Sequence, residues 1–472
     1  MSVNLVWFRR DLRLSDNPAL YEATQNGKPI VPLFILDENT ASSGAAFKWR
    51  LGLSIESLSL DLERHNSRLI LRKGKPLNVL KELKSMLGDL SIFWNRLYDE
   101  VSVERDTEIK SYFESIGVSV TSREGTLLHS PWKTQTNSGS HYKVFTPFWK
   151  ALAKQEVKQA LPKPNKLIKP LKWPESDDLK RWNLEKEIGR GKEYLFETVN
   201  VGEESAKVGL ETFLRERLKN YAQSRDRVDL TESSNLSENL AYGEISAREI
   251  WHSALSQKDV EFNEKEMFMR QLAWRDFAWY LSYFSPHIIY KNWKSEWDYF
   301  PWREDEGELN SWKRGLTGQP IVDAGMREMY TTGRMHNRVR MIVASYLTKH
   351  LLIDWRQGLK WFEECLIDWD PASNAMGWQW VAGSGPDASP FFRVFNPELQ
   401  AKKFDPEGKY QMKYLGQSYE SNDQSGKFYD MAPKSWHIDQ KSRPSSSIVD
   451  LKFGRDRALN SYSKFKKIIA DL

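Results

Sequence analysis

The stretch NLVWF at residues 4–8, followed by PIVPLFIL at residues 29–36, decides the fold class of the N-terminal part of the chain. Both are short apolar runs rich in branched and aromatic side chains, which is typical of buried strands. Two further candidate strands lie at residues 68–71 and 91–94, and helix-like stretches lie at residues 45–64 and 76–87. Strands that alternate with helices predict a parallel sheet with helices on both faces, over residues 1–130.

The chain changes character after this region. Residues 161–172, LPKPNKLIKPLK, combine proline with lysine, and proline blocks regular helix. We therefore expect a long linker over residues 131–205, followed by an all-α domain over residues 206–472. In that domain Ser246 and Glu249 have the spacing of a capping box. Further expected helices cover residues 268–283 and 321–346, and expected loops cover residues 421–426 and 442–447.

Composition excludes several classes of protein. The 472 residues suffice for two domains, and the formal net charge of +5 permits DNA binding without demonstrating it. The single cysteine, Cys365, excludes a disulfide within the chain and argues against a thiolate metal site. No apolar run is long enough to span a membrane and no signal peptide is recognisable, so we expect a soluble, cytoplasmic protein. The 20 tryptophans suggest ring stacking or redox chemistry beyond packing.

The most unusual stretch is residues 368–397, DWDPASNAMGWQWVAGSGPDASPFFRVFNP. Three tryptophans, two adjacent phenylalanines and three aspartates stand among small residues. Aromatic rings favour burial, whereas buried carboxylates need partners. From the residues alone two interpretations stay open: a pocket for a large planar, partly polar molecule, or an ordinary aromatic core.

Residues 335–341, MHNRVRM, are expected to be helical, with Asn337, Arg340 and Met341 on one face. An arginine on a largely apolar face needs an acidic partner, and either Asp368 or Asp370 would supply one. His336, in the same stretch, is expected to be a structural histidine, because no second ligand stands at metal-binding spacing beside it.

Other residues predict contacts with phosphates and bases. The hydroxyl-rich residues 233–237 precede an expected helix and would suit a phosphate, although from these residues alone an ordinary helix cap is the favoured explanation. Arginine binds phosphate and tryptophan stacks on unpaired bases. The candidates for such a surface are Arg225, Trp274, Arg275, Arg338 and Trp380.

Together these motifs resemble the photolyase/cryptochrome family, and within it the bacterial cyclobutane pyrimidine dimer photolyases of class I type. The resemblance runs in order through nearly the whole chain, over residues 5–20, 143–150, 235–246, 271–277, 317–329, 332–355, 368–397 and 400–410. It implies a Rossmann-like N-terminal antenna domain, a long linker and a C-terminal helical domain that holds FAD.

The resemblance also implies roles for individual residues. Those expected to contact FAD are Tyr221, Ser233, Ser234, Asn235, Leu236, Ser237, Asn337, Arg340, Asp368, Asp370 and Asn374, of which Asn374 faces the flavin N5 and Arg340 pairs with Asp368. Those expected to pass electrons between flavin and surface are Trp378, Trp355 and Trp302. Those expected to contact damaged DNA are Arg225, Gln271, Trp274, Arg275, Asn337, Arg338, Met341 and Trp380. No metal ligand is implied.

The implied activity is light-dependent repair by a monomer acting on UV-damaged DNA. The damaged dinucleotide flips out of the duplex. Photoexcited, reduced FAD passes an electron to the cyclobutane ring, which splits and returns the electron. A second, antenna chromophore of unknown identity stays open, because Ser102 and Val103 stand about where folate-binding members have Asn and Glu.

Two alternatives remain. Gln271 stands where dimer photolyases usually have Glu, and Gln there resembles (6-4) photolyases. Those enzymes, however, carry two histidines at the positions of Asn337 and Met341, so the dimer is the favoured substrate. The other alternative is a cryptochrome-type blue-light receptor. Because residues 448–465 resemble the ordinary photolyase terminus and no long tail follows, we expect repair rather than signalling.

Overall fold

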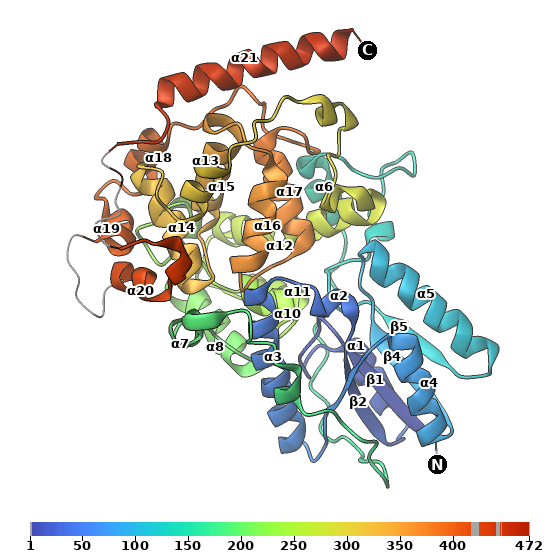
Figure 1. Cartoon of the computed structure of the whole chain (residues 1–472). Helices are drawn as coiled ribbons and strands as arrows, with labels where there is room; N and C mark the ends of the chain where they lie inside the picture. Colours follow the sequence, from blue (N-terminus) through green and yellow to red (C-terminus); the bar gives the residue numbers. More distant parts are fainter. Residues whose placement is uncertain (1, 417–423, 440–443, 445, 472) are drawn as a thin grey trace. The chain divides into compact units, whose positions relative to one another are not determined.

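In the computed structural model, which describes residues 2–416, 424–439, 444 and 446–471, the chain forms two compact units. Unit 1 contains a sheet and several helices, and unit 2 is helical (Figure 1). Unit 1 comprises Met1–Glu187, Asn200–Tyr221 and Ser234–Pro286, and unit 2 comprises Ile188–Val199, Ala222–Ser233 and His287–Leu472. The domain boundaries at residues 130 and 205 stay a prediction.

Unit 1 is built on a parallel sheet of five strands in the order β3-β2-β1-β4-β5. The strands are β1 (Val3–Phe8), β2 (Ile30–Leu36), β3 (Ile70–Lys73), β4 (Leu90–Asn95) and β5 (Val120–Arg123). Every residue of β1 and β2 is buried, as a sheet covered on both faces requires. The predicted α/β class with a Rossmann-like sheet is confirmed. The sequence does not predict β5, because its four residues, VTSR, include only one apolar side chain.

Helices cover both faces of this sheet. On one face the apolar sides of α4 (Pro76–Leu87) and α5 (Glu100–Ser115) share a core with alternate strand residues, including Leu5, Leu33 and Ile92. Figure 1 shows α3 (Ala45–Arg64) on the opposite side from α4 and α5. Both α3 and α4 begin and end at the predicted residues. The two remaining helices of this part are α1 (Pro18–Thr24) and α2 (Glu38–Ala41).

The proline- and lysine-rich residues 161–172 form neither helix nor strand. Backbone hydrogen bonds hold them to earlier residues of unit 1: Asp16 N–H donates to Leu161 O at 2.9 Å, and Ile30 N–H donates to Ile168 O at 2.8 Å. The other helices that lie within unit 1 are α6 (Phe145–Leu152), α8 (Glu203–Glu216), α10 (Ser237–Tyr242), α11 (Ala247–Leu255) and α12 (Phe262–Phe284). The predicted helix start at Ser246 is confirmed, because the Ser246 hydroxyl accepts from Glu249 N–H at 2.9 Å and α11 begins at the next residue. The reciprocal bond of a capping box is not formed, since Glu249 Oε2 has no hydrogen-bond partner among the described residues.

The helices beyond Pro286 are α13 (Glu306–Lys313), α14 (Pro320–Thr332), α15 (Asn337–Ser345), α16 (Trp355–Cys365), α17 (Pro371–Ala382), α18 (Pro397–Phe404), α19 (Lys409–Leu415), α20 (Gln424–Met431) and α21 (Leu451–Ala470). Earlier in the chain, α7 (Lys192–Phe196) belongs to unit 2, whereas α9 (Tyr221–Ser224) begins at the last residue of a unit 1 segment. Short 3₁₀ turns occur at Pro131–Lys133, Leu179–Trp182, Gly189–Gly191, Leu218–Asn220, Pro286–Ile289, Ser295–Tyr299 and Lys434–Trp436.

The single helix predicted over residues 321–346 is wrong. The structure has two helices, α14 and α15, and a π-helical turn, Tyr346–His350, that follows α15. The break occurs because Gly333 takes a left-handed conformation, φ +67°, which ends α14, and His336 then caps α15. The loop expected at residues 421–426 is wrong from residue 424, where α20 begins, and its residues 421–423 lie outside the described residues. Of the other expected loop, residues 442, 443 and 445 also lie outside them.

A buried charge cluster joins α3 to α10 within unit 1. The Arg50 guanidinium contacts Glu244 at 2.7 Å and Glu238 at 3.3 Å, and all three side chains are at most 1% exposed. Arg50 also donates to Asn200 O at 2.8 Å. Buried charges are tolerated only when paired in this way.

We expect Arg50→Met to lower the free energy of unfolding by about 3–5 kcal/mol, because it leaves two buried carboxylates without their cation. Arg64→Met on the same helix is the control. The Arg64 side chain is 71% exposed and, among the residues that the structure describes, pairs only with Asp61, so the loss should stay below about 1 kcal/mol. Urea unfolding followed by circular dichroism measures both. Equal losses in the two variants would contradict the prediction.

Candidate functional site

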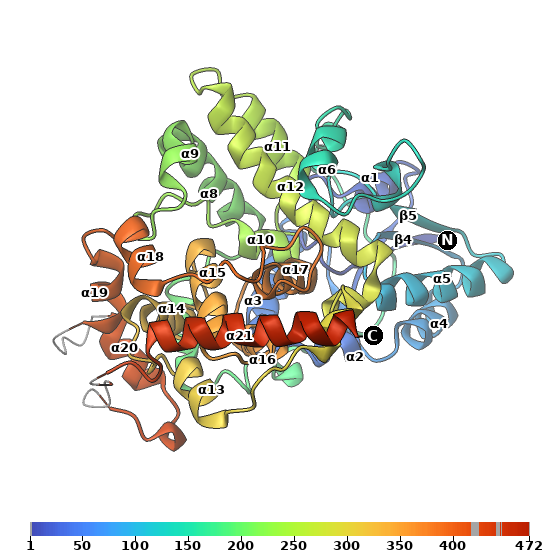
Figure 2. The same cartoon turned by 90° about the horizontal axis from the view of Figure 1, so that it is seen from above.

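Helix α17 in unit 2, Pro371–Ala382, forms the first half of the unusual stretch at residues 368–397. Asp370 caps the helix, accepting from Ser373 N–H at 2.7 Å, and Pro371 occupies its first turn. Asn374 is 8% exposed and donates to Asp370 O at 3.1 Å. The helix ends at Gly383, which has a φ of +96°. It packs against both α15 and α16, and the three helices lie together in Figure 2.

An ion pair ties α15 to the segment before α17. Nη2 of Arg340 lies 2.7 and 2.9 Å from the two carboxylate oxygens of Asp368, and Nε donates to Met335 O at 2.8 Å. The partner that the sequence left open is therefore Asp368, and Asp370 serves as the helix cap. Among the described residues, Nη1 of Arg340 has no acceptor. A half-buried guanidinium with a free donor suits an electron-rich polar ring such as a flavin.

His336 is a helix cap. Its Nδ1 accepts from Arg338 N–H at 3.1 Å, so Nε2 carries the proton of the neutral ring and donates to Arg225 O at 3.0 Å. Burial lowers the pKa of His336 to about 4, and the neighbouring arginines add to the effect. The side chain of Arg338 contacts Asp226 at 2.6 Å, and that of Arg225 lies 3.7 Å from the same carboxylate. Two of the three predicted DNA-contacting arginines, Arg225 and Arg338, therefore share one acidic partner.

Trp378 lies in an aromatic pocket of unit 2. Its ring centroid is 4.9 Å from that of Phe362 and 6.1 Å from that of Trp312. It also packs closely on the backbone of α16 at Gly358, where an added Cβ would lie 2.1 Å from the indole. Sequence analysis did not single out Gly358 or Trp312, although a glycine inside an amphipathic helix is a signal of close packing.

The other two tryptophans of the expected electron path are Trp355 and Trp302. Trp355 begins α16, one turn before Gly358; it is fully buried and donates to Asn292 Oδ1 at 2.9 Å. The bridge between Arg303 and Ile353 brings Trp302 beside the segment that leads into Trp355. Trp302 is half-buried and packs on Phe300 with centroids 4.4 Å apart.

The predicted DNA-contacting residues of α15 and α17 remain partly accessible. Asn337 is exposed and Met341 is half-buried; the Asn337 amide lies 3.9 Å from the Met341 sulfur, which confirms their common helix face. Trp380 is half-buried, whereas Trp378, two residues earlier, is buried. Two residues correspond to about 200° around a helix, so the two indoles leave α17 on different sides.

Unit 1 carries the other predicted DNA-contacting residues, on α12. The Gln271 amide donates to Met267 O at 2.9 Å, one turn back on the same helix. Trp274 is half-buried and stacks on Phe145. The Arg275 guanidinium donates to Thr126 O at 2.9 Å and lies 3.3 Å from Asp276, so an internal role accounts for it. Its predicted contact with phosphate, made because arginine binds phosphate, stays a prediction.

The remaining predicted cofactor contacts are Tyr221 and residues 233–237. Tyr221 is buried between the rings of Phe213 and Phe268, each 5.5 Å away. Leu236 N–H donates to the Ser234 hydroxyl at 3.5 Å, and α10 begins at the next residue, Ser237. Ser233 belongs to unit 2, and Asn235, with a φ of +56°, belongs to unit 1.

Lys349 was not among the site residues predicted from the sequence. It lies in the π-helical turn after α15 and is 1% exposed. Its amine donates to Ala382 O, at the end of α17, at 3.1 Å and sits 3.4 Å from the centre of the Phe391 ring. Burial lowers its pKa well below the ordinary value. The sequence gives no sign that this lysine is buried, because a single lysine in an apolar helix is ordinarily expected to reach solvent.

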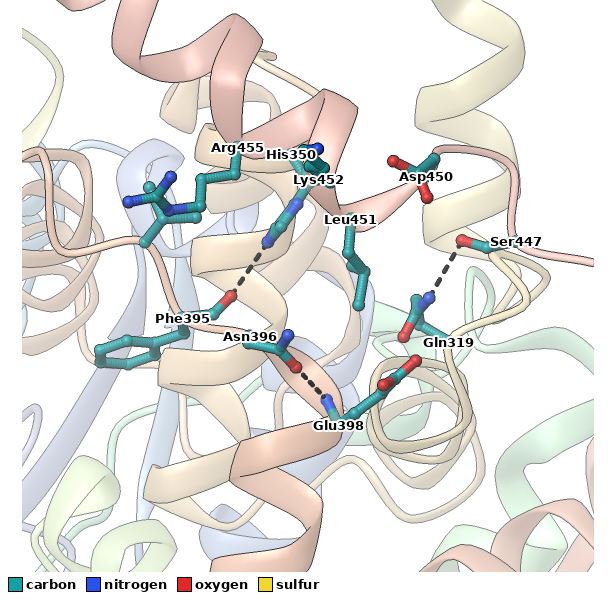
Figure 3. Close-up of a pocket in the computed structure, with 11 residues that line it drawn as sticks. Gln319, His350, Phe395, Asn396, Glu398, Ser447, Asp450, Leu451, Lys452 and Arg455 are labelled. Carbon is teal, nitrogen blue, oxygen red and sulfur yellow. Dashed lines mark hydrogen bonds between the residues drawn. The ribbon is translucent and has the colours of Figure 1, made fainter.

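A separate cavity of about 540 Å³ lies in unit 2 beside the start of α21. Figure 3 shows Gln319 and His350 on its wall, with His350 bonded to Phe395 O and Gln319 to Ser447. None of the predicted site residues lines it. Within the described residues there is no helix long and apolar enough to cross a membrane, and no cluster of three potential metal ligands.

We expect Gly358→Ala to disturb Trp378, because the added methyl group would meet the indole and the Leu347 side chain at 2.1 to 2.7 Å. The loss of stability should be about 1–3 kcal/mol. Gly377→Ala is the matched control: it lies on α17 with no atom within 4 Å of the new methyl group, and should stabilise by about 0.5–1 kcal/mol. Urea unfolding compares them, and equal effects would rule out the close packing at Gly358.

The His336 cap predicts a pH dependence. Its pKa is about 4 in the folded protein and near 6.5 when unfolded, so between these values the unfolded chain binds more protons. Stability should therefore fall as the pH drops from about 6.5 to 4. His336→Asn keeps a capping acceptor without the titration. Unfolding midpoints measured across this range should fall less steeply in the variant; parallel curves would contradict the assignment.

Comparison with known proteins identifies the family. A family model described as DNA photolyase matches residues 4–165, and one described as the FAD binding domain of DNA photolyase matches residues 268–464. A deoxyribodipyrimidine photo-lyase from Agrobacterium fabrum is 41% identical over 98% of both chains. Cryptochrome-2 from Arabidopsis thaliana is 33% identical over 87% of this chain and 70% of its own length.

Solved structures agree. A bacterial class III photolyase from Agrobacterium tumefaciens has a TM-score of 0.91 at 41% identity, covering 99% of this chain and 98% of its own. An archaeal photolyase from Sulfolobus tokodaii, described with two FAD molecules, has a TM-score of 0.79 at 29% identity, over 98% and 100% of the chains. These similarities do not support the class I type expected from sequence, since the bacterial structure is of class III. The chain belongs to the photolyase/cryptochrome family and carries the FAD-binding domain of DNA photolyase.

Proposed function

We propose that this protein is a light-dependent DNA repair enzyme, a deoxyribodipyrimidine photo-lyase of class III type that acts on cyclobutane pyrimidine dimers. The observation that carries the proposal is the similarity, end to end, to a photo-lyase at 41% identity. The arrangement of α17 is consistent with it. The buried indole of Trp378 packs against α16, whereas the indole of Trp380, on the same helix, is partly accessible. Electron supply and substrate contact can therefore use separate side chains.

FAD bound in the helical domain, in its reduced form, would supply the electron that opens the cyclobutane ring. Arg340, Asp368, Asp370 and Asn374 would hold the flavin ring, with Asn374 beside N5. An amide there cannot readily donate a proton to the ring, which favours a fully reduced, anionic flavin. Tyr221, Ser233, Ser234, Asn235, Leu236, Ser237 and Asn337 are the further cofactor contacts that we propose.

The protein's own residues would then do three things. Trp378, Trp355 and Trp302 would carry electrons from the surface to the cofactor when it needs reduction. Half-buried aromatic rings, Trp274 and Trp380, would stack on unpaired bases of DNA. Arg225, Arg275 and Arg338 would meet phosphates, and Gln271, Asn337 and Met341 would contact the damaged bases.

The test is repair itself. The FAD-loaded protein is reduced chemically, mixed with UV-irradiated oligothymidine and exposed to blue light, and recovery of thymine absorbance is recorded. Recovery is expected with the dimer substrate and not with an oligonucleotide that carries a (6-4) photoproduct. Recovery only with the (6-4) product would favour the alternative raised by Gln271, and no recovery with either would favour a receptor of the cryptochrome type.

Trp355→Phe should separate the electron path from repair. Phenylalanine is much harder to oxidise than tryptophan, so photoreduction of oxidised flavin should slow by at least about tenfold, a change of some 1.4 kcal/mol in barrier. Chemically pre-reduced variant should repair dimers at the normal rate. Flavin absorbance under blue light and the thymine assay give the two readings. Loss of repair in the pre-reduced variant would contradict the assigned role of Trp355.

A further inference from the structure

Phe145 and Trp274 form an unusually close ring pair in unit 1. Phe145 is the first residue of α6 and Trp274 lies in the middle of α12. Their ring centroids are 3.6 Å apart and their planes differ by 9°. Phe145 is 2% exposed and Trp274 is half-buried. One face of the indole is therefore covered by a fixed ring, and its accessible surface lies elsewhere.

Surrounding packing enforces this geometry. Free aromatic rings prefer offset or edge-to-face arrangements to a near-parallel pair with closely superposed centres. Phe277, one turn after Trp274 on α12, contacts both rings at an angle: its centroid lies 5.8 Å from that of Phe145 and 5.9 Å from that of Trp274. The Arg270 guanidinium lies 5.4 Å from the Phe145 centroid. Phe145 thus stands in a corner made by α12 side chains and cannot easily turn away.

Residues 143–150 match the family, yet no role follows for Phe145 from the resemblance or from the comparisons. We propose that Phe145 is a positioning residue that acts through Trp274: it covers one face of the indole and sets the tilt at which the other face meets a single unpaired base. This inference rests on the proposed role of Trp274 in contacting damaged DNA. The stack fixes the orientation of Trp274 before DNA arrives, which reduces the ordering cost of binding.

Phe148 offers a matched control on the same helix. It is also 2% exposed and packs on α12, with its centroid 4.9 Å from those of Phe277 and Tyr280, but it forms no ring contact with Trp274. Phe145→Leu and Phe148→Leu therefore remove similar packing, and only the first removes the stack on the indole. Phe145→Met, which fills the site without a ring, replaces Phe145→Leu if that variant does not fold.

The experiment measures binding in the dark. FAD-loaded wild type, the two leucine variants, Trp274→Ala and the double variant Phe145→Leu/Trp274→Ala are titrated against a labelled duplex with one thymine dimer and against the same undamaged duplex. Phe145→Leu should weaken dimer binding about three- to tenfold, as expected for loss of one aromatic pair, and leave undamaged binding unchanged. Phe148→Leu should preserve dimer binding. In the Trp274→Ala background, Phe145→Leu should add nothing.

Two kinds of result would overturn the proposed role of Phe145 and leave the proposed role of Trp274 intact. In one, Phe145→Leu and Phe148→Leu weaken dimer binding equally, or Phe145→Leu keeps its full effect without the indole, which means general packing. In the other, Trp274→Ala weakens dimer binding but Phe145→Leu does not. If Trp274→Ala leaves dimer binding unchanged, the proposed contact of Trp274 with DNA fails, and this inference fails with it, whereas light-driven repair by the wild type would still stand.

Discussion

The ion pair between Arg340 and Asp368 is the interaction on which the rest of unit 2 depends. The Asp368 carboxylate is 5% exposed and would be costly to bury without its cation. Because Arg340 lies on α15 and Asp368 stands just before α17, the pair holds the segment that leads into α17 against α15, and the Asp370 cap then starts the helix. The placement of Asn374, Trp378 and Trp380 follows from that start, since all three are on this helix.

Close backbone packing adds a second constraint. Gly358 lets the Trp378 indole lie against α16, the helix that Trp355 begins. At the far end of α17 the buried amine of Lys349 donates a hydrogen bond to Ala382 O, one of the last carbonyl groups of the helix. Three contacts therefore fix α17. The Arg340–Asp368 ion pair holds the segment before it, the absence of a side chain at Gly358 lets Trp378 pack on α16, and Lys349 binds its last residues. Such a support is what a site for a rigid planar cofactor needs.

Unit 1 uses a different device for its candidate substrate residue. The indole of Trp274 is oriented by another ring, Phe145, and by the edge of Phe277. Arg275, adjacent in sequence, donates a hydrogen bond to Thr126 O, so part of its guanidinium is held by the protein itself. Trp274 and Arg275 are neighbours on one helix, yet their environments differ, and the identity of the two side chains does not predict that difference. The family comparison names the fold and cofactor domain, but these local differences come from the packing.

Much of the fold was determined by sequence alone. Apolar periodicity located four of the five strands and the limits of α3 and α4, and local cap chemistry located the start of α11, because these signals depend on residues a few positions apart. The need of Arg340 for an acidic partner was also readable, although the choice between Asp368 and Asp370 was not. Only the tertiary structure decided that choice, the strand β5, the space at Gly358 and the stack of Phe145 on Trp274. Each of these depends on atoms far apart in the chain, and a pattern of neighbouring residues carries no information about which distant surfaces meet.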